Sequence, residues 1–261
     1  MLKKRLIVAA LLLPPVLGVV WLGGYALIIL ALACMTVCAY EYYSFAFKPN
    51  SRELSQLLLI TMLPPVAFLV HSYPGLIAFY YLGLIFLTIK ALSKIEKPIH
   101  EPKLQEAFIP QFAAYTFLVC FCSNLVITAS SENASHAYFW ILATVMGTDT
   151  GAYFIGKMLG KKKLAPRVSP NKTIAGSVGG LIIGVGLGVF VAIQLGMPHP
   201  IYEMVFFGII ASFLCQLGDL FQSLIKRTYE VKDSGTLLPG HGGMFDRIDG
   251  LLFAVPVIYF L

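Results

Sequence analysis

The sequence predicts an all-α integral membrane protein, a polytopic helical bundle with about nine transmembrane helices. The chain has 261 residues, of which 58% are hydrophobic and only 12% are charged, against roughly 25% charged residues in an ordinary soluble domain. No charged residue occurs between Arg5 and Glu41 or between Glu53 and Lys90. Each stretch is long enough for two passes of the roughly 20 residues that cross a bilayer. This composition excludes a soluble globular protein.

Nine apolar segments, separated by turn residues and charges, are the expected helices. They cover residues 6–22, 25–46, 54–72, 75–92, 107–128, 136–156, 173–195, 202–225 and 247–261. The last segment would be about 22 Å long as a helix, so it either barely spans the bilayer or ends inside it. No separate soluble domain lies between the segments. Residues 1–261 are therefore expected to form a single membrane-embedded domain.

The lysines and arginines predict the orientation of the chain. With the N-terminus in the cytoplasm, all 19 of them lie in inside segments or at the inner end of a span. The inside segments are 1–5, 47–53, 93–106, 157–172 and 226–246. The outside loops hold none, which is the asymmetry of the positive-inside rule. The catalytic loops, about 157–172 and 226–249, are therefore expected to face the cytoplasm.

Three acidic residues fall inside apolar segments, where ionisable groups are expensive and rare. Glu41 lies near the inner end of its span and could reach the interface, which favours a structural role. Asp149 lies eight residues before Lys157, and Asp219 lies seven before Lys226. Both carboxylates should therefore sit roughly 10–12 Å below the cytoplasmic surface. We expect them to share one cavity, the alternative being that each is tied to a neighbouring polar side chain.

The helix that carries Asp219 continues into a polar segment. Asp219, Ser223 and Lys226 are spaced i, i+4, i+7, so they line one helical face. Beyond them come cations, a glycine-rich turn and two carboxylates, at Lys226, Arg227, Lys232, His241, Asp246 and Asp249. Glycines let a backbone approach phosphate closely, and Lys and Arg neutralise it. Helix capping could explain one of the two carboxylates, but not both beside two membrane-embedded acids.

The other polar loop ends in Ser169-Pro170-Asn171-Lys172-Thr173, directly before the seventh apolar segment. One interpretation is a positively charged inside loop with a helix start at Pro170 or Thr173. The other is that a nucleotide binds the side chains of Ser169, Asn171, Lys172 and Thr173. The sequence favours neither interpretation over the other.

One stretch of 27 residues combines these features in a fixed order. It has the pattern Ser223-x-Ile225-Lys226-Arg227-x4-Lys232-Asp233-x-Gly235-x2-Leu238-Pro239-x-His241-Gly242-Gly243-Met244-x-Asp246-Arg247-Ile248-Asp249. This pattern resembles the signature of the phosphatidate cytidylyltransferases, also called CDP-diacylglycerol synthases. The resemblance extends to Asp149 with Ala152-Tyr153, to residues 169–173 and to Gly176. Asn171 departs from it, because the family more often has a basic residue there.

The resemblance implies transfer of CMP from CTP to phosphatidate, giving CDP-diacylglycerol and pyrophosphate. It implies a multi-pass protein of the bacterial inner membrane whose partners are CTP, phosphatidate and the bilayer, with no nucleic acid. Mg²⁺ suits a cluster of aspartates, and a second cation, for which a monovalent ion is one candidate, stays open. The five cysteines lie in apolar runs, so no cysteine-based metal site is expected.

Each candidate residue has an expected role in this reaction. Asp219 and Asp246 would bind the metal, with Asp149 and Asp249 as supporting ligands. Lys226, Arg227 and Lys232 would hold phosphates, and His241 would donate a hydrogen bond to one. The remaining expected nucleotide-binding residues are Ser169, Asn171, Lys172, Thr173, Ser223 and Arg247.

Two other functions fit parts of the pattern. A CTP-dependent polyprenol kinase would also pair a nucleotide with a membrane lipid. A cation-coupled transporter would also use acids at membrane depth, but it would not need a long cytoplasmic insert rich in Lys, Arg and Gly.

A stripe of glycines also marks the seventh segment. Gly176, Gly180, Gly184 and Gly188 recur every four residues, which would let another helix approach closely. That helix could belong to this chain or to a second copy, and the family resemblance favours a homodimer.

Overall fold

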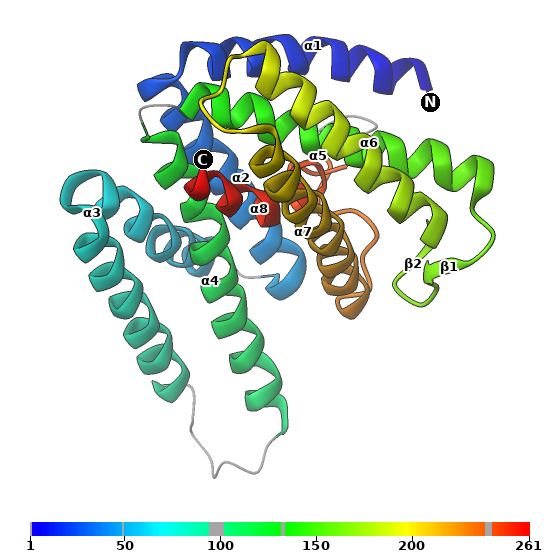
Figure 1. The fold of residues 1–261 in the computed structure, drawn as a ribbon. Coiled ribbons are helices and arrows are strands. Elements are labelled where there is room, and N and C mark those ends of the chain that lie inside the picture. The colour runs from blue at the N-terminus through cyan, green and yellow to red at the C-terminus, as the bar shows by residue number, and fades with distance from the viewer. Residues whose placement is uncertain (1, 49, 94–101, 132–133, 238–241) are drawn as a thin grey trace. The chain divides into compact units, whose positions relative to one another are not determined.

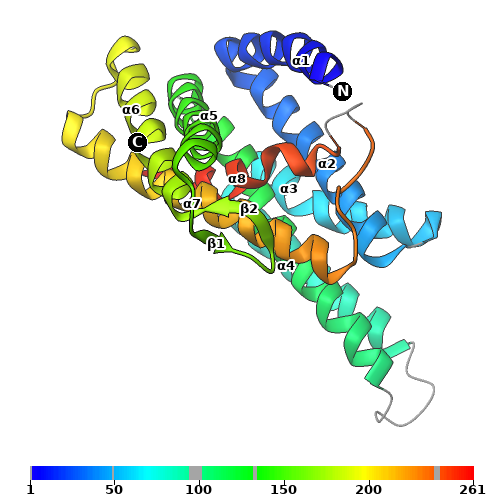
Figure 2. The same cartoon turned by 90° about the vertical axis from the view of Figure 1, so that its right-hand side faces the viewer.

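A computed structural model describes residues 2–48, 50–93, 102–131, 134–237 and 242–261 of the chain. The described part is helical apart from one short hairpin (Figures 1 and 2). In order, the elements are α1 (Leu2–Leu22), α2 (Gly24–Phe47), α3 (Ser51–Ser93), α4 (Pro102–Ala129), α5 (Ala134–Leu159), β1 (Lys163–Ala165), β2 (Ser169–Thr173), α6 (Ile174–Gln194), α7 (Ile201–Thr228), α8 (Phe245–Ala254) and the 3₁₀ helix η1 (Val255–Phe260).

The helices follow the apolar segments of the sequence. Two predicted segments, 54–72 and 75–92, lie in α3, whose backbone leaves the helical conformation at Ser72 (φ 57°, ψ −148°), the last residue of the first segment. Four stretches are long and apolar enough to cross a membrane: Gly24–Phe47, Ser51–Tyr73, Ile174–Gln194 and Ile201–Thr228. The chain is thus an all-α membrane protein, and the number of about nine spans stays a prediction.

The chain divides into two compact units. Residues 1–30 and 128–261 form the first unit, and residues 31–127 form the second. The second unit contains most of α2 together with α3 and most of α4. Its interior holds aromatic and hydroxyl side chains, such as Tyr43, whose hydroxyl lies 2.7 Å from Oγ1 of Thr61. Glu41 is buried in this unit and so does not reach an exposed surface as the sequence allowed, and its structural role stays a prediction.

In the first unit, α5 and α6 run side by side along their lengths (Figure 1). The glycine stripe of α6 makes this possible, because a Cβ at Gly180 would lie 2.6 Å from the carbonyl oxygen of Thr148 and one at Gly176 would lie 2.7 Å from that of Ala152. Gly184 and Gly188 likewise face the side chains of Thr148 and Thr144. The stripe therefore packs within the chain and is not the surface that a second copy would use.

The loop between α5 and α6 contains a β-hairpin that the sequence analysis did not predict. Strands β1 and β2 pair antiparallel, with Lys163 opposite Thr173 and Ala165 opposite Ser169. At the tip, the N–H of Val168 donates to the carbonyl of Ala165 at 3.2 Å, a turn in which Pro166 fills a position that proline favours. Thr173 ends β2 and caps α6, since its Oγ1 accepts a hydrogen bond from the N–H of Gly176 at 3.1 Å. The predicted helix start at Thr173 is confirmed.

The last apolar segment forms α8 followed by the 3₁₀ helix. Pro256 lies near the start of that helix and removes a backbone donor from the α-helical ladder, which favours the change of helix type. Close packing holds α8 against α7: a Cβ at Gly218 would lie 2.6 Å from the carbonyl oxygen of Asp249, and one at Gly250 would lie 2.6 Å from Sγ of Cys215. This contact brings Asp249 next to the part of α7 that carries Asp219.

Candidate active site

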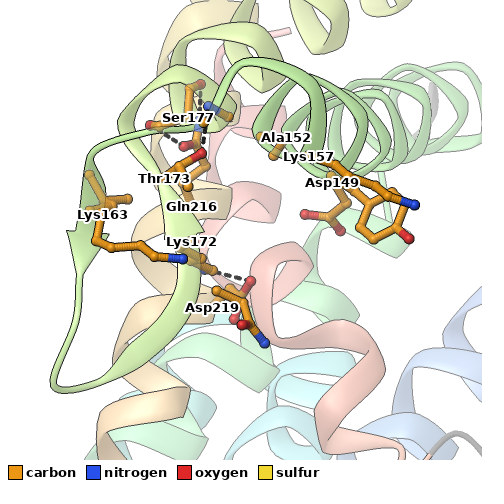
Figure 3. Close-up of a pocket in the computed structure, with 15 residues that line it drawn as sticks. Asp149, Ala152, Lys157, Lys163, Lys172, Thr173, Ser177, Gln216 and Asp219 are labelled. Atoms are coloured by element: carbon orange, nitrogen blue, oxygen red, sulfur yellow. Dashed lines mark hydrogen bonds and ion pairs between the residues drawn. The ribbon is translucent and has the colours of Figure 1, made fainter.

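A cavity of about 580 Å³ lies between α5, the hairpin, α6 and α7 (Figure 3). Its wall is formed by one face of the last turns of α5, by the hairpin and the first turn of α6, and by two residues of α7. The lining residues are Asp149, Ala152, Tyr153, Gly156, Lys157, Gly160, Lys163, Leu164, Asn171, Lys172, Thr173, Gly176, Ser177, Gln216 and Asp219.

Two carboxylates from different helices line this cavity. Asp149 comes from α5 and Asp219 from α7, so the two acids that the sequence placed at equal depth lie in one cavity. Asp219 is bound on both sides: Nζ of Lys172 lies 2.6 Å from its Oδ2, and Ser223 donates a hydrogen bond to its Oδ1 at 3.4 Å. Asp249 on α8 interacts electrostatically with both acids.

Three lysines also line the cavity. Lys157 lies in the last turn of α5, on the same helix as Asp149, and Lys163 and Lys172 lie on the two strands of the hairpin. The sequence analysis singled out Lys172 but attributed Lys157 and Lys163 to the positive-inside pattern alone. A helical signal was present for Lys157, because it lies eight residues after Asp149 and hence on the same face of α5. Lys163 had no such signal, since only the hairpin brings it back to the cavity.

A polar pair completes the wall one turn deeper than Asp219. The hydroxyl of Ser177 on α6 donates to Oε1 of Gln216 on α7, and Nε2 of Gln216 donates to the backbone carbonyl of Ser177 at 3.2 Å. These two bonds fix the orientation of the amide. Neither residue was predicted from the sequence, because a single polar residue on an apolar helix gives no indication of its partner.

Asp246 and Lys226 form a second charged contact. Nζ of Lys226 lies 2.7 Å from Oδ1 of Asp246, and their side chains are only 14% and 6% exposed. The other oxygen, Oδ2, accepts hydrogen bonds from the backbone N–H groups of Ser234 at 2.8 Å and Gly243 at 3.0 Å. We call these four residues the Asp246 anchor, because they join the end of α7, the following loop and the start of α8.

The environment of Asp246 stabilises its ionised form. Burial by itself raises the pKa of the Asp246 carboxyl, but the hydrogen bonds from Lys226, Ser234 and Gly243 outweigh this effect and hold its pKa below the ordinary value of an aspartate. The loop is shaped for this contact: Gly242 adopts φ 79°, and a Cβ there would lie 2.8 Å from Oδ2 of Asp246.

The remaining predicted site residues are divided between the exposed surface, the cavity and the part of the chain outside the described residues. Arg227, Lys232 and Arg247 are exposed, and Ser169 is half-buried at the start of β2. Asn171 and Thr173 line the cavity. His241 falls outside the described residues. Among the residues that are described, no group of three or more His, Cys, Asp and Glu side chains is close enough together to hold a metal ion by itself.

Comparison with known proteins decides the family. A family model described as the cytidylyltransferase family matches residues 3–261. The chain belongs to the cytidylyltransferase family. The resemblance found in the signature of residues 223–249 is therefore confirmed over nearly the whole chain.

Three relatives illustrate the similarity, and all three carry the name phosphatidate cytidylyltransferase. The chain is 42% identical to the Bacillus subtilis protein over 149 residues, which are 57% of this chain and 55% of the relative. It is 35% identical to the Staphylococcus haemolyticus protein over 204 residues, 78% of this chain and 75% of the relative. With the Thermotoga maritima protein it shares 32% identity over 266 residues, 99% of this chain and 95% of the relative. The chain thus spans only about half the length of the B. subtilis relative.

Proposed function

We propose that this protein transfers CMP from CTP to phosphatidate, producing CDP-diacylglycerol and pyrophosphate for phospholipid synthesis. One observation carries the proposal: Asp149 and Asp219 line a single cavity together with three lysines, near the ends of long apolar helices. A nucleoside triphosphate and a lipid phosphate bring several negative charges together, so their site needs cations positioned around them. Membership of the cytidylyltransferase family and the names of the relatives support this choice of substrates.

The chemistry is an in-line displacement at the α-phosphorus of CTP. A phosphate oxygen of phosphatidate forms the new P–O bond, and the bond between the α-phosphorus and the oxygen bridging to the β-phosphate breaks, so that pyrophosphate leaves. A phosphomonoester with a second pKa near 6 is largely dianionic at neutral pH, so the attack requires no general base. Catalysis then consists of positioning the two phosphates and stabilising the charge that develops.

Different residues would position the phosphates, neutralise their charge and attract the triphosphate. Lys157, Lys163 and Lys172 would neutralise the phosphates of the two substrates. Asn171 and Thr173 offer polar groups beside them. The exposed cations of the signature, Arg227, Lys232 and Arg247, would attract the triphosphate from the cytoplasmic side.

The acidic residues fit a Mg²⁺ ion. Mg²⁺ is usually bound by one or two carboxylates plus substrate phosphates and water, and Asp149 and Asp219 supply two carboxylates to one cavity, with Asp249 close by. The ion would offset the negative charge of the triphosphate and favour departure of pyrophosphate. We propose Asp219 and Asp149 as its main ligands. Asp246 receives a positioning role instead, because it does not line the cavity and its carboxylate is held by Lys226 and by the backbone N–H groups of Ser234 and Gly243.

The proposal includes a membrane topology. The nine apolar segments would each enter the bilayer, with the hairpin and the loop after α7 on the cytoplasmic face of the bacterial inner membrane. The two compact units would together form the single domain expected from the sequence, with the catalytic cavity in the first. The packing of the glycine stripe against α5 gives no support for a homodimer.

One experiment tests the function and separates it from the polyprenol kinase. Purified protein is incubated with phosphatidate, Mg²⁺ and CTP labelled in the cytosine base. We expect label to enter the lipid fraction while pyrophosphate is released in equal amount. A kinase would leave the label in free CDP, and a transporter would leave CTP intact, so either result would overturn the proposal.

A further inference from the structure

The hairpin and the residues directly before it carry two sets of cations, one that lines the cavity and one that does not. Lys163 and Lys172 line the cavity. The second set is exposed, does not line the cavity and forms no ion pair within the described part of the chain. It consists of Lys161, Lys162 and Arg167. We call these three residues the outer hairpin face.

No acidic side chain of the same stretch balances this charge. Between Asp149 and Glu203 the sequence contains no acidic residue, so both flanks of the hairpin, the end of α5 and the whole of α6, are free of carboxylates. Within residues 150–202 the outer hairpin face therefore carries charge of one sign, which is complementary to phosphate groups.

Exposed apolar side chains adjoin the hairpin at both of its ends. Met158 and Leu159, directly before the hairpin, are 75% and 64% exposed, and Val178, in the first turns of α6, is 55% exposed. Large exposed apolar side chains of this kind require either lipid or an apolar partner. Because α6 is one of the stretches long and apolar enough to cross a membrane, the hairpin begins where the hydrocarbon region ends. Cations beside apolar side chains at this level are typical of a membrane surface.

We propose that the outer hairpin face binds anionic phospholipid headgroups at the membrane surface and thereby concentrates phosphatidate at the mouth of the cavity. This inference rests on the proposed function for its substrate and on the proposed cytoplasmic position of the hairpin. Lipid headgroups fit the outer hairpin face better than a soluble acidic partner does, because a soluble partner would leave Met158 and Leu159 in water. Lys163 lies on the same hairpin and inside the cavity, so a lipid held on the outer face is a short distance from the proposed reaction site.

The first test compares two charge-matched double variants of the full-length protein in phosphatidylcholine vesicles that contain phosphatidate. One carries Lys162→Gln with Arg167→Gln, and the control carries Lys48→Gln with Arg52→Gln, which removes one exposed lysine and one exposed arginine from the other unit. We expect the hairpin variant to raise the KM for phosphatidate by at least about fivefold, since each cation near an anionic surface contributes about a fivefold attraction. Its KM for CTP and its kcat should match the wild type, and raised ionic strength should reduce the difference.

The other outcomes of this kinetic test each contradict the inference. A rise in the KM for CTP would mean that the outer face guides the nucleotide. Equal effects of the hairpin variant and the control would mean that surface charge in general, and not the hairpin, attracts the lipid. An unchanged KM for phosphatidate would mean that the outer hairpin face only helps to set the membrane topology.

The second test needs no catalysis. Hydrogen–deuterium exchange of backbone amides 161–168 is measured for the wild type in phosphatidylcholine vesicles with and without phosphatidylglycerol. We expect slower exchange in the anionic vesicles, and we expect the hairpin double variant to lose this difference. Equal exchange in both vesicle types would overturn the inference even if cytidine transfer is found. Slower exchange without cytidine transfer would instead retain the lipid contact and reject the proposed function.

Discussion

Nζ of Lys172 lies 2.6 Å from Oδ2 of Asp219. This ion pair joins the second strand of the hairpin to α7, so it connects two parts of the cavity wall, and one of them carries the proposed metal-binding carboxylate (Figure 3). Both side chains remain partly open, with exposed fractions of 24% and 34%. The pair can therefore contact a bound substrate without unfolding of either element.

Removal of the Lys172 charge should impair catalysis more than stability. A partly exposed ion pair contributes about 0–1 kcal/mol, so Lys172→Gln should lower the Tm by little. Loss of a phosphate-neutralising cation should lower kcat/KM for CTP by at least about tenfold. Steady-state kinetics with Lys48→Gln as the control measures this. A Tm decrease of many degrees with unchanged kcat/KM would assign Lys172 a purely structural role.

The Asp246 anchor should behave as one unit in stability measurements. Breaking a buried ion pair by removal of one partner costs about 3–5 kcal/mol, so Asp246→Asn and Lys226→Met should each destabilise the protein strongly. The double variant should cost little more than either single change, because the contact is already lost. Denaturant unfolding in detergent gives the free energy of unfolding of the wild type, the two single variants and the double variant. Additive losses would show that the two side chains act separately.

The same anchor predicts a dependence of stability on pH. The pKa of Asp246 is lowered in the folded protein from its ordinary value of 3.8, so the folded state favours the ionised carboxylate. Its contribution is fully present above the unfolded pKa and is lost as the pH falls through the folded pKa. The stability difference between wild type and Asp246→Asn should be constant near neutral pH and shrink below about pH 4. Thermal unfolding over this range measures it, and a difference that grows on acidification would contradict the assignment.

The glycine stripe of α6 provides a matched comparison on one helix. A Cβ at Gly180 would meet the backbone of α5, whereas one at Gly186 would have no atom within 4 Å. Gly180→Leu and Gly184→Leu should therefore reduce the yield of folded protein in detergent, and Gly186→Leu should not. Size-exclusion chromatography and thermal unfolding measure the difference. Similar behaviour of Gly180→Leu and Gly186→Leu would mean that α5 and α6 do not pack through this stripe.

The sequence predicted the helices well because hydrophobic length and turn residues act locally. The break of α3 at Ser72 falls on the last residue of a predicted segment, directly before the expected gap at 73–74. The hairpin was missed, since its strands are short and polar and depend on pairing between Lys163 and Thr173. The one local signal was Pro166 at the turn.

The sequence predicted the acidic residues of the candidate site better than it predicted the residues that pair with them. Asp149 and Asp219 stand out in any apolar helix, because a charge there is rare. Which lysine pairs with which carboxylate depends on contacts between distant segments, and spacing could not reveal it. Lys226 shares a helical face with Asp219 in the sequence pattern, yet it reaches Asp246 on the next helix.

The most direct test of the central claim is the rate of cytidine transfer by Asp219→Asn at saturating Mg²⁺. Asparagine keeps the shape of the side chain and removes the charge that would hold the ion. The transfer of base-labelled cytidine into phosphatidate should fall by about two orders of magnitude or more, while the Tm stays close to that of the wild type. Full transfer by this variant would contradict the account and leave Asp219 as a structural carboxylate paired with Lys172.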